Sequence, residues 1–125
     1  MCCTSWRKVY LYPKITSTSI EYSEFSGTGG QLDFVRGAFD SKGGKSIIAF
    51  RSTAKDGKIS RVVPRLEQGA MVTVPRMDTH YLITKYGTAC LKGKSGRERV
   101  LTTMDVAHPR FRDDLIREAQ NIRVL

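Results

Sequence analysis

Hydrophobic positions recur at helical intervals directly after a glycine-rich stretch in the first third of the chain. The stretch "SGTGG" (residues 26–30) is followed by Leu32, Val35 and Phe39, which would share one face of a helix. The glycines have no side chains to restrict the backbone of the stretch, and the apolar face of the helix could pack against a core. The pattern predicts a loop that leads into a helix within residues 26–39, with these three apolar side chains buried.

Two further stretches near the C-terminus have the same helical spacing. "RERVLTTMDVA" (97–107) and "FRDDLIREAQNI" (111–122) each place apolar residues on one helical face. His108 and Pro109 stand between them, and proline disfavours an α conformation in the preceding residue while it suits the first turn of a new helix. We therefore expect two helices that meet at this junction, with a structural role for His108.

Four shorter apolar runs are typical of strands, and they alternate with the helical stretches. They are residues 46–50, 60–66, 70–75 and 80–84. Continuous apolar runs suit strands that are buried on both faces of a parallel sheet. Strands interspersed with helices predict a layered α/β domain, so we expect 46–50, 70–75 and 80–84 in one mostly parallel sheet covered by helices.

Residues 1–25 differ from the rest of the chain in composition and in their lack of regular turn signals. They contain the Ser/Thr-rich stretch "KITSTSIEYSE" (14–24), which is β-prone and has no strong turn signal. The start, "MCCTSWRKVYLYPK", lacks the apolar stretch of a signal peptide, and we expect none. We divide the chain into a divergent N-terminal segment, 1–25, and one domain, 26–125, because 125 residues suffice for a single modest core.

The composition adds a strong positive charge to an otherwise ordinary globular chain. Lys and Arg number 21 against 12 Asp and Glu, which gives a net charge of +9. Such an excess indicates a polyanionic partner, which could be nucleic acid, an anionic surface or a phosphate-rich small molecule, although the charge could also serve solubility alone. No apolar run approaches the roughly 18 residues of a membrane span, so we expect no membrane partner.

Cysteine and histidine usage argues against disulfides and metals. Cys2, Cys3 and Cys90 form no CxxC pair and no even-numbered framework, which favours a reducing compartment. We expect a cytoplasmic protein, or a mitochondrial one if the source is a eukaryote. His80 and His108 have no further ligand at metal spacing, so we expect no metal site and a structural hydrogen bond for His80.

The chemistry of the glycine stretch has two readings. It lacks the serine of a nucleophile elbow and the Gly-Lys-Ser/Thr of a phosphate-binding P-loop. It could be a simple tight turn, because glycine tolerates positive φ. It could instead let backbone N–H groups approach a ligand at the N-terminus of the helix that follows, where negative charge is favoured.

Four stretches in a fixed order carry a resemblance to a known family. They are "SGTGGQLDFVRGA", "GGKSIIAFRSTAKDGKISRVVPRL", "GAMVTVPRMDTHYLITKYGTACLKGKS" and "AHPRFRDDLIREA". Together they resemble the C-terminal domain of the acetyl-CoA hydrolase/transferase family, and within it the 4-hydroxybutyrate and butyrate–acetate CoA-transferases. The resemblance runs from about Ser26 to about Ala119, so it identifies residues 26–125 with this domain.

The resemblance implies a fold and an activity. The fold would be α/β, of the CoA-transferase-like (NagB/RpiA) type, with an open, mostly parallel sheet flanked by helices. Family members move CoA between an acyl-CoA and a short-chain carboxylate such as acetate, butyrate or 4-hydroxybutyrate, through a glutamyl-CoA thioester. Coenzyme A and acyl-CoA would be substrates, and no cofactor would be bound permanently. The active site lies between two domains, which implies an N-terminal CoA-transferase domain as partner and leaves a homo-oligomer open.

The family's glycine loop corresponds to Gly27, Gly29 and Gly30 of this chain. A backbone N–H there would stabilise the oxyanion of the thioester. Contacts to CoA are expected from residues beside the loop and from basic residues further along: Thr28, Gln31, Lys42, Lys45 and Lys94.

Two departures from the family bear on activity. The catalytic glutamate of the family lies upstream of the glycine loop, and neither Glu21 nor Glu24 fits its motif. We therefore expect the isolated chain to be inactive, with the glutamate in a missing upstream part. In addition, Lys85 in "TKYG" stands where relatives usually have an acidic residue.

Two alternatives of other classes stay open. The first is a basic nucleic-acid-binding module, which charge alone supports; it would need exposed aromatics among the basic residues, whereas Phe34, Phe39, Phe50 and Tyr81 read as core. The second is a non-catalytic fragment, an alternative that the absence of the family's glutamate motif favours. We expect no nucleic acid as partner.

Overall fold

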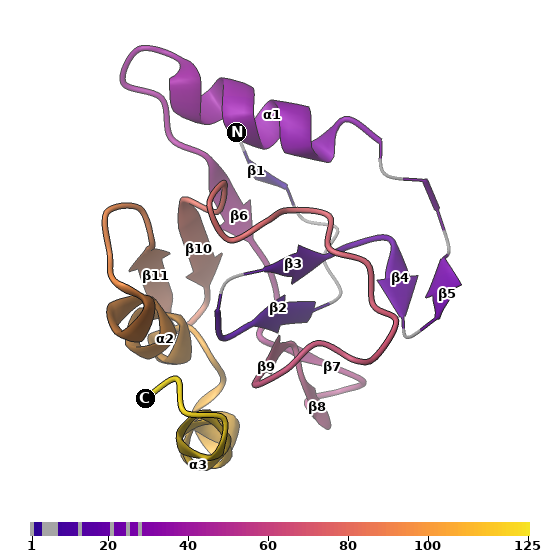
Figure 1. Ribbon diagram of the computed structural model, residues 1–125, viewed down its shortest axis with the longest axis vertical. Coiled ribbons are helices and arrows are strands. Elements are labelled where there is room, and N and C mark those ends of the chain that lie inside the picture. The colour runs from indigo at the N-terminus through magenta and orange to yellow at the C-terminus, as the bar shows by residue number, and fades with distance from the viewer. Residues whose placement is uncertain (1, 4–7, 13, 21, 25, 28) are drawn as a thin grey trace.

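The computed structural model describes residues 2–3, 8–12, 14–20, 22–24, 26–27 and 29–125. They form a mixed α/β arrangement, in which small sheets occupy the middle (Figure 1). Helix α1 (Gln31–Asp40) lies at one end of the molecule, and α2 (Gly96–Asp105) and α3 (Arg112–Asn121) lie at the other. The three helices expected from the hydrophobic spacing are confirmed.

The largest sheet contains two of the expected strands as parallel neighbours. Its order is β1-β6-β10-β11, with bounds Cys2–Cys3, Ile47–Ala49, Tyr81–Thr84 and Gly87–Cys90. β6 pairs in parallel with both β1 and β10, whereas β11 runs antiparallel to β10. The expected α/β class with a mostly parallel sheet is therefore confirmed for this sheet.

Shorter strands make the rest of the β structure. A three-stranded sheet has the order β3-β2-β9, with bounds Ile15–Thr16, Lys8–Tyr10 and Val62–Val63. Two hairpins add β4 (Ser19–Ile20) with β5 (Ser23–Glu24) and β7 (Thr53–Ala54) with β8 (Ile59–Ser60). The second hairpin turns at Asp56 and Gly57, where Gly57 has a φ of +84°.

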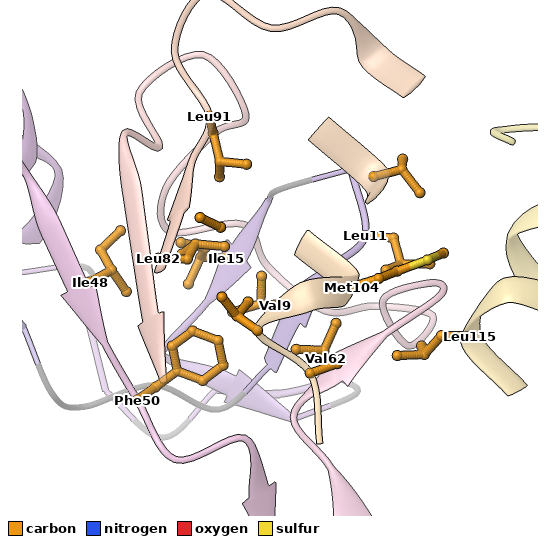
Figure 2. Packing of buried hydrophobic residues seen from close by; sticks show 14 of the residues in the cluster. Val9, Leu11, Ile15, Ile48, Phe50, Val62, Leu82, Leu91, Met104 and Leu115 are labelled. Atoms are coloured by element: carbon orange, nitrogen blue, oxygen red, sulfur yellow. The ribbon is translucent and has the colours of Figure 1, made fainter. Parts of the chain in front are cut away.

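The core lies between the two larger sheets and the C-terminal helices. Figure 2 shows Ile48 and Leu82 of the four-stranded sheet in one cluster with Val9, Ile15 and Val62 of the three-stranded sheet. From the C-terminal helices, Val100, Met104, Leu115 and Ala119 join the same cluster. Full burial of one such aliphatic side chain contributes about 1.5–3 kcal/mol, so this cluster holds the sheets together.

The expected strand at 70–75 is wrong. Only Val74 makes a β-bridge, to Ile15, while the Met71 and Val72 side chains are exposed. The Met71 N–H donates to Ser19 Oγ at 2.8 Å. This N–H therefore bonds to a side chain and not to the backbone carbonyl of a neighbouring strand. The segment consequently follows β3 at a single point and adds no strand to the four-stranded sheet.

The burial expected for the first helix is correct only in part. Val35 is buried and Leu32 packs against the core, but Phe39 is 40% exposed and Phe34 is 59% exposed. The reading of both phenylalanines as core residues is therefore wrong. Helix α1 lies at the end of the molecule, so only a narrow strip of its surface reaches the core.

In the part of the chain that the structure describes, no helix combines the length and the apolar character that a membrane span requires.

Candidate functional site

The glycine loop is an open approach to the first turn of α1. Gly27, Gly29 and Gly30 are exposed, and none of them lies in a strand. Gly29 has a φ of +52°, and a Cβ atom built on it would have no heavy atom within 4 Å. The residue is therefore glycine because of its left-handed backbone, not because neighbouring protein atoms leave no room. A ligand can approach the backbone at this point.

The backbone N–H groups of the first turn of α1 face the loop and receive no side-chain cap. Its N-cap residue is Gly30, and no side chain caps the helix with a hydrogen bond. Gly30 O accepts from Phe34 N at 3.0 Å, which begins the helical bonding pattern. The first amides of a helix have no partner within the helix, so those of α1 point towards the glycine loop and favour negative charge there.

The expected CoA contacts lie in different places around α1. Gln31 is the first residue of the helix, next to the loop, and Thr28 lies outside the described residues. Lys42 and Lys45 follow the other end of α1, which is about 15 Å long at 1.5 Å per residue. Lys45 lines an open pocket of about 330 Å³ with Phe34 and Ser41.

Lys94 lies in a third place, directly before α2. Its Nζ donates to Thr102 Oγ1 at 2.9 Å, so the exposed side chain folds back over the helix. Ser95 caps α2 by accepting from Glu98 N, and the Glu98 carboxylate accepts from Ser95 N at 2.7 Å. These hydrogen bonds from Ser95 lower the pKa of Glu98, because they stabilise the charged carboxylate.

His80 lies at the start of β10 among aromatic and cationic side chains. Its ring is 5.0 Å from Phe39 edge-on and 4.3 Å from Tyr81, and its Nδ1 is buried with no hydrogen-bond partner. The structural hydrogen bond expected for His80 is therefore absent at Nδ1. Burial lowers the pKa of His80, and the charges of Lys92 and Lys45 lower it further.

His108 has the junction role expected for it. Its Nδ1 accepts from Arg110 N at 3.2 Å, and it caps the 3-10 turn Pro109–Phe111 that leads into α3. Among the described residues, no three His, Cys, Asp or Glu side chains come together as metal ligands would.

No acidic nucleophile stands out beside the loop in the described residues. Glu24 is an exposed residue of the short strand β5, and Glu21 lies outside the described residues. Among the described residues, the arrangement can therefore offer backbone donors to an oxyanion.

Sequence reasoning singled out Lys85 only as a departure from the relatives, and it missed the group of cations to which Lys85 belongs. Arg51 and Arg61, which flank the β7–β8 hairpin, line a single open pocket together with Lys85, which is distant from them in the chain. The signal that could have found two of them is position, since Arg51 and Lys85 each follow a buried parallel strand. Ligands of open α/β sheets bind at the carboxyl ends of such strands.

Comparison with known proteins shows the family. The sequence model of the acetyl-CoA hydrolase/transferase C-terminal domain matches residues 1–119, so the match includes residues 1–25. The boundary that we set at residue 26 stays a prediction. Of the curated relatives, the 4-hydroxybutyrate coenzyme A transferase of Clostridium kluyveri is 50% identical over 111 residues, which are 89% of this chain and 26% of the relative. The butyryl-CoA:acetate CoA-transferase of Anaerostipes caccae is 44% identical over 119 residues, 93% of this chain and 27% of the relative.

Solved structures agree with the sequence comparison. RipA from Yersinia pestis superposes with a TM-score of 0.91 at 44% identity, over 99% of this chain and 28% of that one. The 4-hydroxybutyrate CoA-transferase of Porphyromonas gingivalis gives a TM-score of 0.72 at 36% identity, over 97% of this chain and 26% of that one. The chain spans about a quarter of the length of these relatives. The expected CoA-transferase-like fold and the resemblance on which it rested are confirmed, and the chain belongs to the acetyl-CoA hydrolase/transferase C-terminal domain family.

Proposed function

We propose that this chain supplies the glycine-loop half of a CoA-transferase that moves CoA between an acyl-CoA and a short-chain carboxylate. The observation that carries the proposal is the open loop at Gly29, whose left-handed backbone stands in front of the uncapped first turn of α1. Membership of the family gives this loop a chemical context. Coenzyme A and acyl-CoA are then substrates, and no permanently bound cofactor is required.

In this proposal the glycines act through their backbone. An N–H of Gly27, Gly29 or Gly30 donates to the thioester carbonyl oxygen as it gains negative charge, and the α1 dipole adds to the stabilisation. Loss of one such donor costs about 3–4 kcal/mol in other enzymes. Thr28 and Gln31 flank the approaching acyl-CoA.

The lysines contact the phosphates of CoA. Lys42 and Lys45, at the far end of α1, and Lys94, before α2, present ammonium groups that suit phosphate oxygens. The pantetheine arm of CoA separates its thioester from its phosphates, so phosphate contacts are expected away from the glycine loop. The pocket beside Lys45 and Phe34 supports a contact at the far end of α1.

The proposal requires a partner with the nucleophile. A glutamate on an N-terminal CoA-transferase domain attacks the acyl-CoA, forms an acyl anhydride and then a glutamyl-CoA thioester, and returns CoA to the acceptor acid. Residues 26–125 form the C-terminal domain in this arrangement, and residues 1–25 are a segment that leads into it. The assembled enzyme works in the cytoplasm, and it is compatible with a homo-oligomer.

Complementation tests this proposal directly. The chain is mixed with the N-terminal part of the Clostridium kluyveri relative, and CoA exchange between butyryl-CoA and acetate is measured. We expect no exchange from the chain alone and exchange from the mixture. Gly29→Val is expected to lower that exchange by about a hundredfold or more, because a branched side chain blocks the carbonyl and cannot adopt the left-handed φ without strain.

The matched control is Gly57→Val, the same change at a glycine that also has a left-handed φ and open space around it, in the turn between β7 and β8, and it should leave exchange unchanged. Circular dichroism of each variant shows whether it is folded. Clear turnover by the chain alone would contradict the proposed division of labour, and Glu21 and Glu24 would then be the first residues to mutate.

A further inference from the structure

Helix α1 carries the glycine loop at its N-terminal end, and only a narrow strip of its surface faces the core. Val35 is the buried residue of this helix, and Leu32 is partly buried against the core cluster. Figure 1 shows the helix at one end of the molecule, beside the sheets and not between them. A narrow apolar strip leaves the direction of a helix poorly determined, so side-chain contacts outside the core have to fix it.

The two ends of α1 are held differently. At the C-terminal end, Gly44 N donates to Ser41 O at 2.8 Å, and a Cβ atom on Gly44 would clash with Ala38 O. The chain therefore returns closely against the last turn of the helix. At the N-terminal end, a Cβ atom on Gly27 or Gly29 would meet no heavy atom within 4 Å. The end that carries the glycine loop thus has less protein packed around it than the other end.

A small tilt of α1 would displace the glycine loop. The helix is about 15 Å long at 1.5 Å per residue, so a tilt of about 4° around its C-terminal end moves the N-terminal end by about 1 Å. In enzymes, a misplacement of about 1 Å can lower the rate about a hundredfold. A contact partway along the helix would prevent this tilt.

Arg36 makes such a contact from the middle of α1. Its Nε donates to Asp78 Oδ1 and its Nη2 donates to Asp78 Oδ2, both at 3.1 Å. Two parallel hydrogen bonds fix the direction of a guanidinium group as well as its distance. On the helix itself, Asp33 lies three residues before Arg36 and Asp40 four residues after it, spacings that allow ion pairs. The two-pronged contact is nevertheless made with Asp78, outside the helix.

The backbone around Asp78 is fixed by its own hydrogen bonds. Asp78 N donates to Pro75 O at 3.1 Å, and Lys92 Nζ donates to Met77 O at 2.7 Å. Thr79, the next residue, is fully buried, and its Oγ1 donates to Pro75 O at 3.3 Å. The Asp78 side chain itself is only 16% exposed. A fixed turn before β10 therefore presents this carboxylate to α1.

This ion pair matters more for geometry than for stability. The Arg36 side chain is 54% exposed, and exposed ion pairs contribute little to the free energy of unfolding. We propose that Asp78 is a positioning residue: through Arg36 it holds α1, and with it the N–H groups of the glycine loop, in the place that CoA transfer requires. Asp78 itself contacts no substrate. The inference rests on the function proposed for the loop.

Residual dipolar couplings of the nitrogen-15-labelled chain measure the direction of α1 relative to the four-stranded sheet. Asp78→Asn keeps the shape of the side chain and removes its charge, and we expect it to change the couplings of α1 while β6 and β10 keep their relative orientation. Arg36→Gln removes the other partner and should change the couplings of α1 in the same way. Arg36→Glu with Asp78→Arg restores an ion pair of reversed polarity and should return the couplings towards the wild-type values.

Exchange in the reconstituted enzyme shows whether this position of α1 matters to the reaction. Asp78→Asn and Arg36→Gln should each lower kcat about tenfold or more, because the backbone donors are then misplaced. The KM for butyryl-CoA should stay close to the wild-type value, since Lys42 and Lys45 follow the end of α1 that does not move.

A double-mutant cycle and rescue separate positioning from a general loss of structure. Asp78→Asn combined with Arg36→Gln should lose no more kcat than either change alone, because both changes break the same contact. The reversed pair, Arg36→Glu with Asp78→Arg, should regain most of the kcat. Circular dichroism shows that each variant is folded.

The matched control is Glu67→Gln, which breaks the ion pair of Lys8 with Glu67, a contact between distant segments that does not involve α1. It should change neither the couplings of α1 nor kcat. Unchanged couplings in Asp78→Asn would overturn the proposal, as would changed couplings together with an unchanged kcat. Absence of exchange in the wild-type mixture would contradict the proposed function, whereas the couplings would still decide whether Asp78 holds α1.

Discussion

His80 is a buried imidazole whose pKa the fold lowers. Its Nδ1 has no hydrogen-bond partner, and the ammonium group of Lys92 is nearby because its Nζ donates to Met77 O at 2.7 Å and lies 4.2 Å from the Phe39 ring centroid. Burial lowers the pKa of His80 first, and repulsion from Lys92 and Lys45 adds to this. A proton on this ring would therefore be costly in the folded state.

The free energy of unfolding should fall as the pH is lowered through the range in which only the unfolded chain protonates this histidine. The unfolded imidazole titrates near 6.5 and the folded one below that value, so the unfolded state binds more protons between the two. The stabilising contribution of His80 is fully present above pH 6.5, and it is lost as the pH falls through the pKa of the folded state. Urea unfolding at about pH 7.5 and about pH 5.5 measures this, and NMR titration of His80 should give a midpoint below 6.5.

His80→Gln removes the titrating group and is the control for this measurement. The difference in stability between the two pH values should be smaller in this variant than in the wild-type chain, whatever its absolute stability. An NMR midpoint at or above 6.5 for His80 would contradict the prediction.

At the scale of single residues, sequence spacing predicted which face of α1 is buried but not the width of that face. Val35 is buried as expected, whereas Phe39 is covered only partly, by Lys92 and by a T-shaped contact with the His80 ring. Periodicity shows that a face exists, and the width of the contact depends on where the helix lies against the sheets. That position comes from contacts between distant segments, such as the ion pair of Arg36 with Asp78 at 3.1 Å.

At the scale of elements, α2 begins at a capping box. Ser95 Oγ accepts from Glu98 N, while the Glu98 carboxylate accepts from Ser95 N. Both bonds satisfy amides that have no partner within the helix. Since α2 contributes Val100 and Met104 to the core, its start matters to the whole domain.

Ser95→Ala should lower the free energy of unfolding by about 1 kcal/mol, because it removes the side-chain acceptor at the start of α2. Urea denaturation of both proteins measures the difference. Ser95→Thr keeps a hydroxyl at the N-cap and should lose much less. Equal losses from the two substitutions would mean that the site matters for packing rather than for capping.

Elements with local signals were predicted, and those that depend on distant partners were not. All three helices follow from periodicity within about ten residues. By contrast, β2 depends on the pairing of Val9 with Val62, which is distant in the sequence. Residues 70–75 form no strand, and the Met71 N–H donates to the Ser19 hydroxyl instead. Neither pairing is visible in a local window, since both depend on how distant segments meet.

At the scale of the whole molecule, the resemblance predicted the family correctly, while the pocket of Arg51, Arg61 and Lys85 was visible only in the structure. Ordered motifs along the chain identify relatives, because their spacing is a property of the sequence. A cluster that brings Lys85 beside Arg51 and Arg61, at the two sides of the β7–β8 hairpin, is a property of the fold. The net charge of +9 is thus divided among separate places, and each can be tested by itself.

CoA affinity in the reconstituted enzyme separates the phosphate contacts from general surface charge. We expect Lys42→Ala with Lys45→Ala to weaken CoA binding about tenfold or more, because a lost charged hydrogen bond to phosphate has this size. Lys94→Ala with Arg97→Ala should have a smaller effect, since the Lys94 ammonium already donates to Thr102 Oγ1. Calorimetric titration with CoA and with dephospho-CoA measures both pairs.

A pair that contacts the 3′-phosphate weakens binding of CoA and leaves that of dephospho-CoA unchanged, because only CoA carries this group. A pair that contacts the diphosphate weakens both ligands equally. The control is Lys58→Ala with Arg65→Ala, which removes the same charge from exposed positions. If the control weakens CoA as much as the other pairs, long-range attraction is the whole effect, and raising the salt concentration should then abolish the differences among all variants.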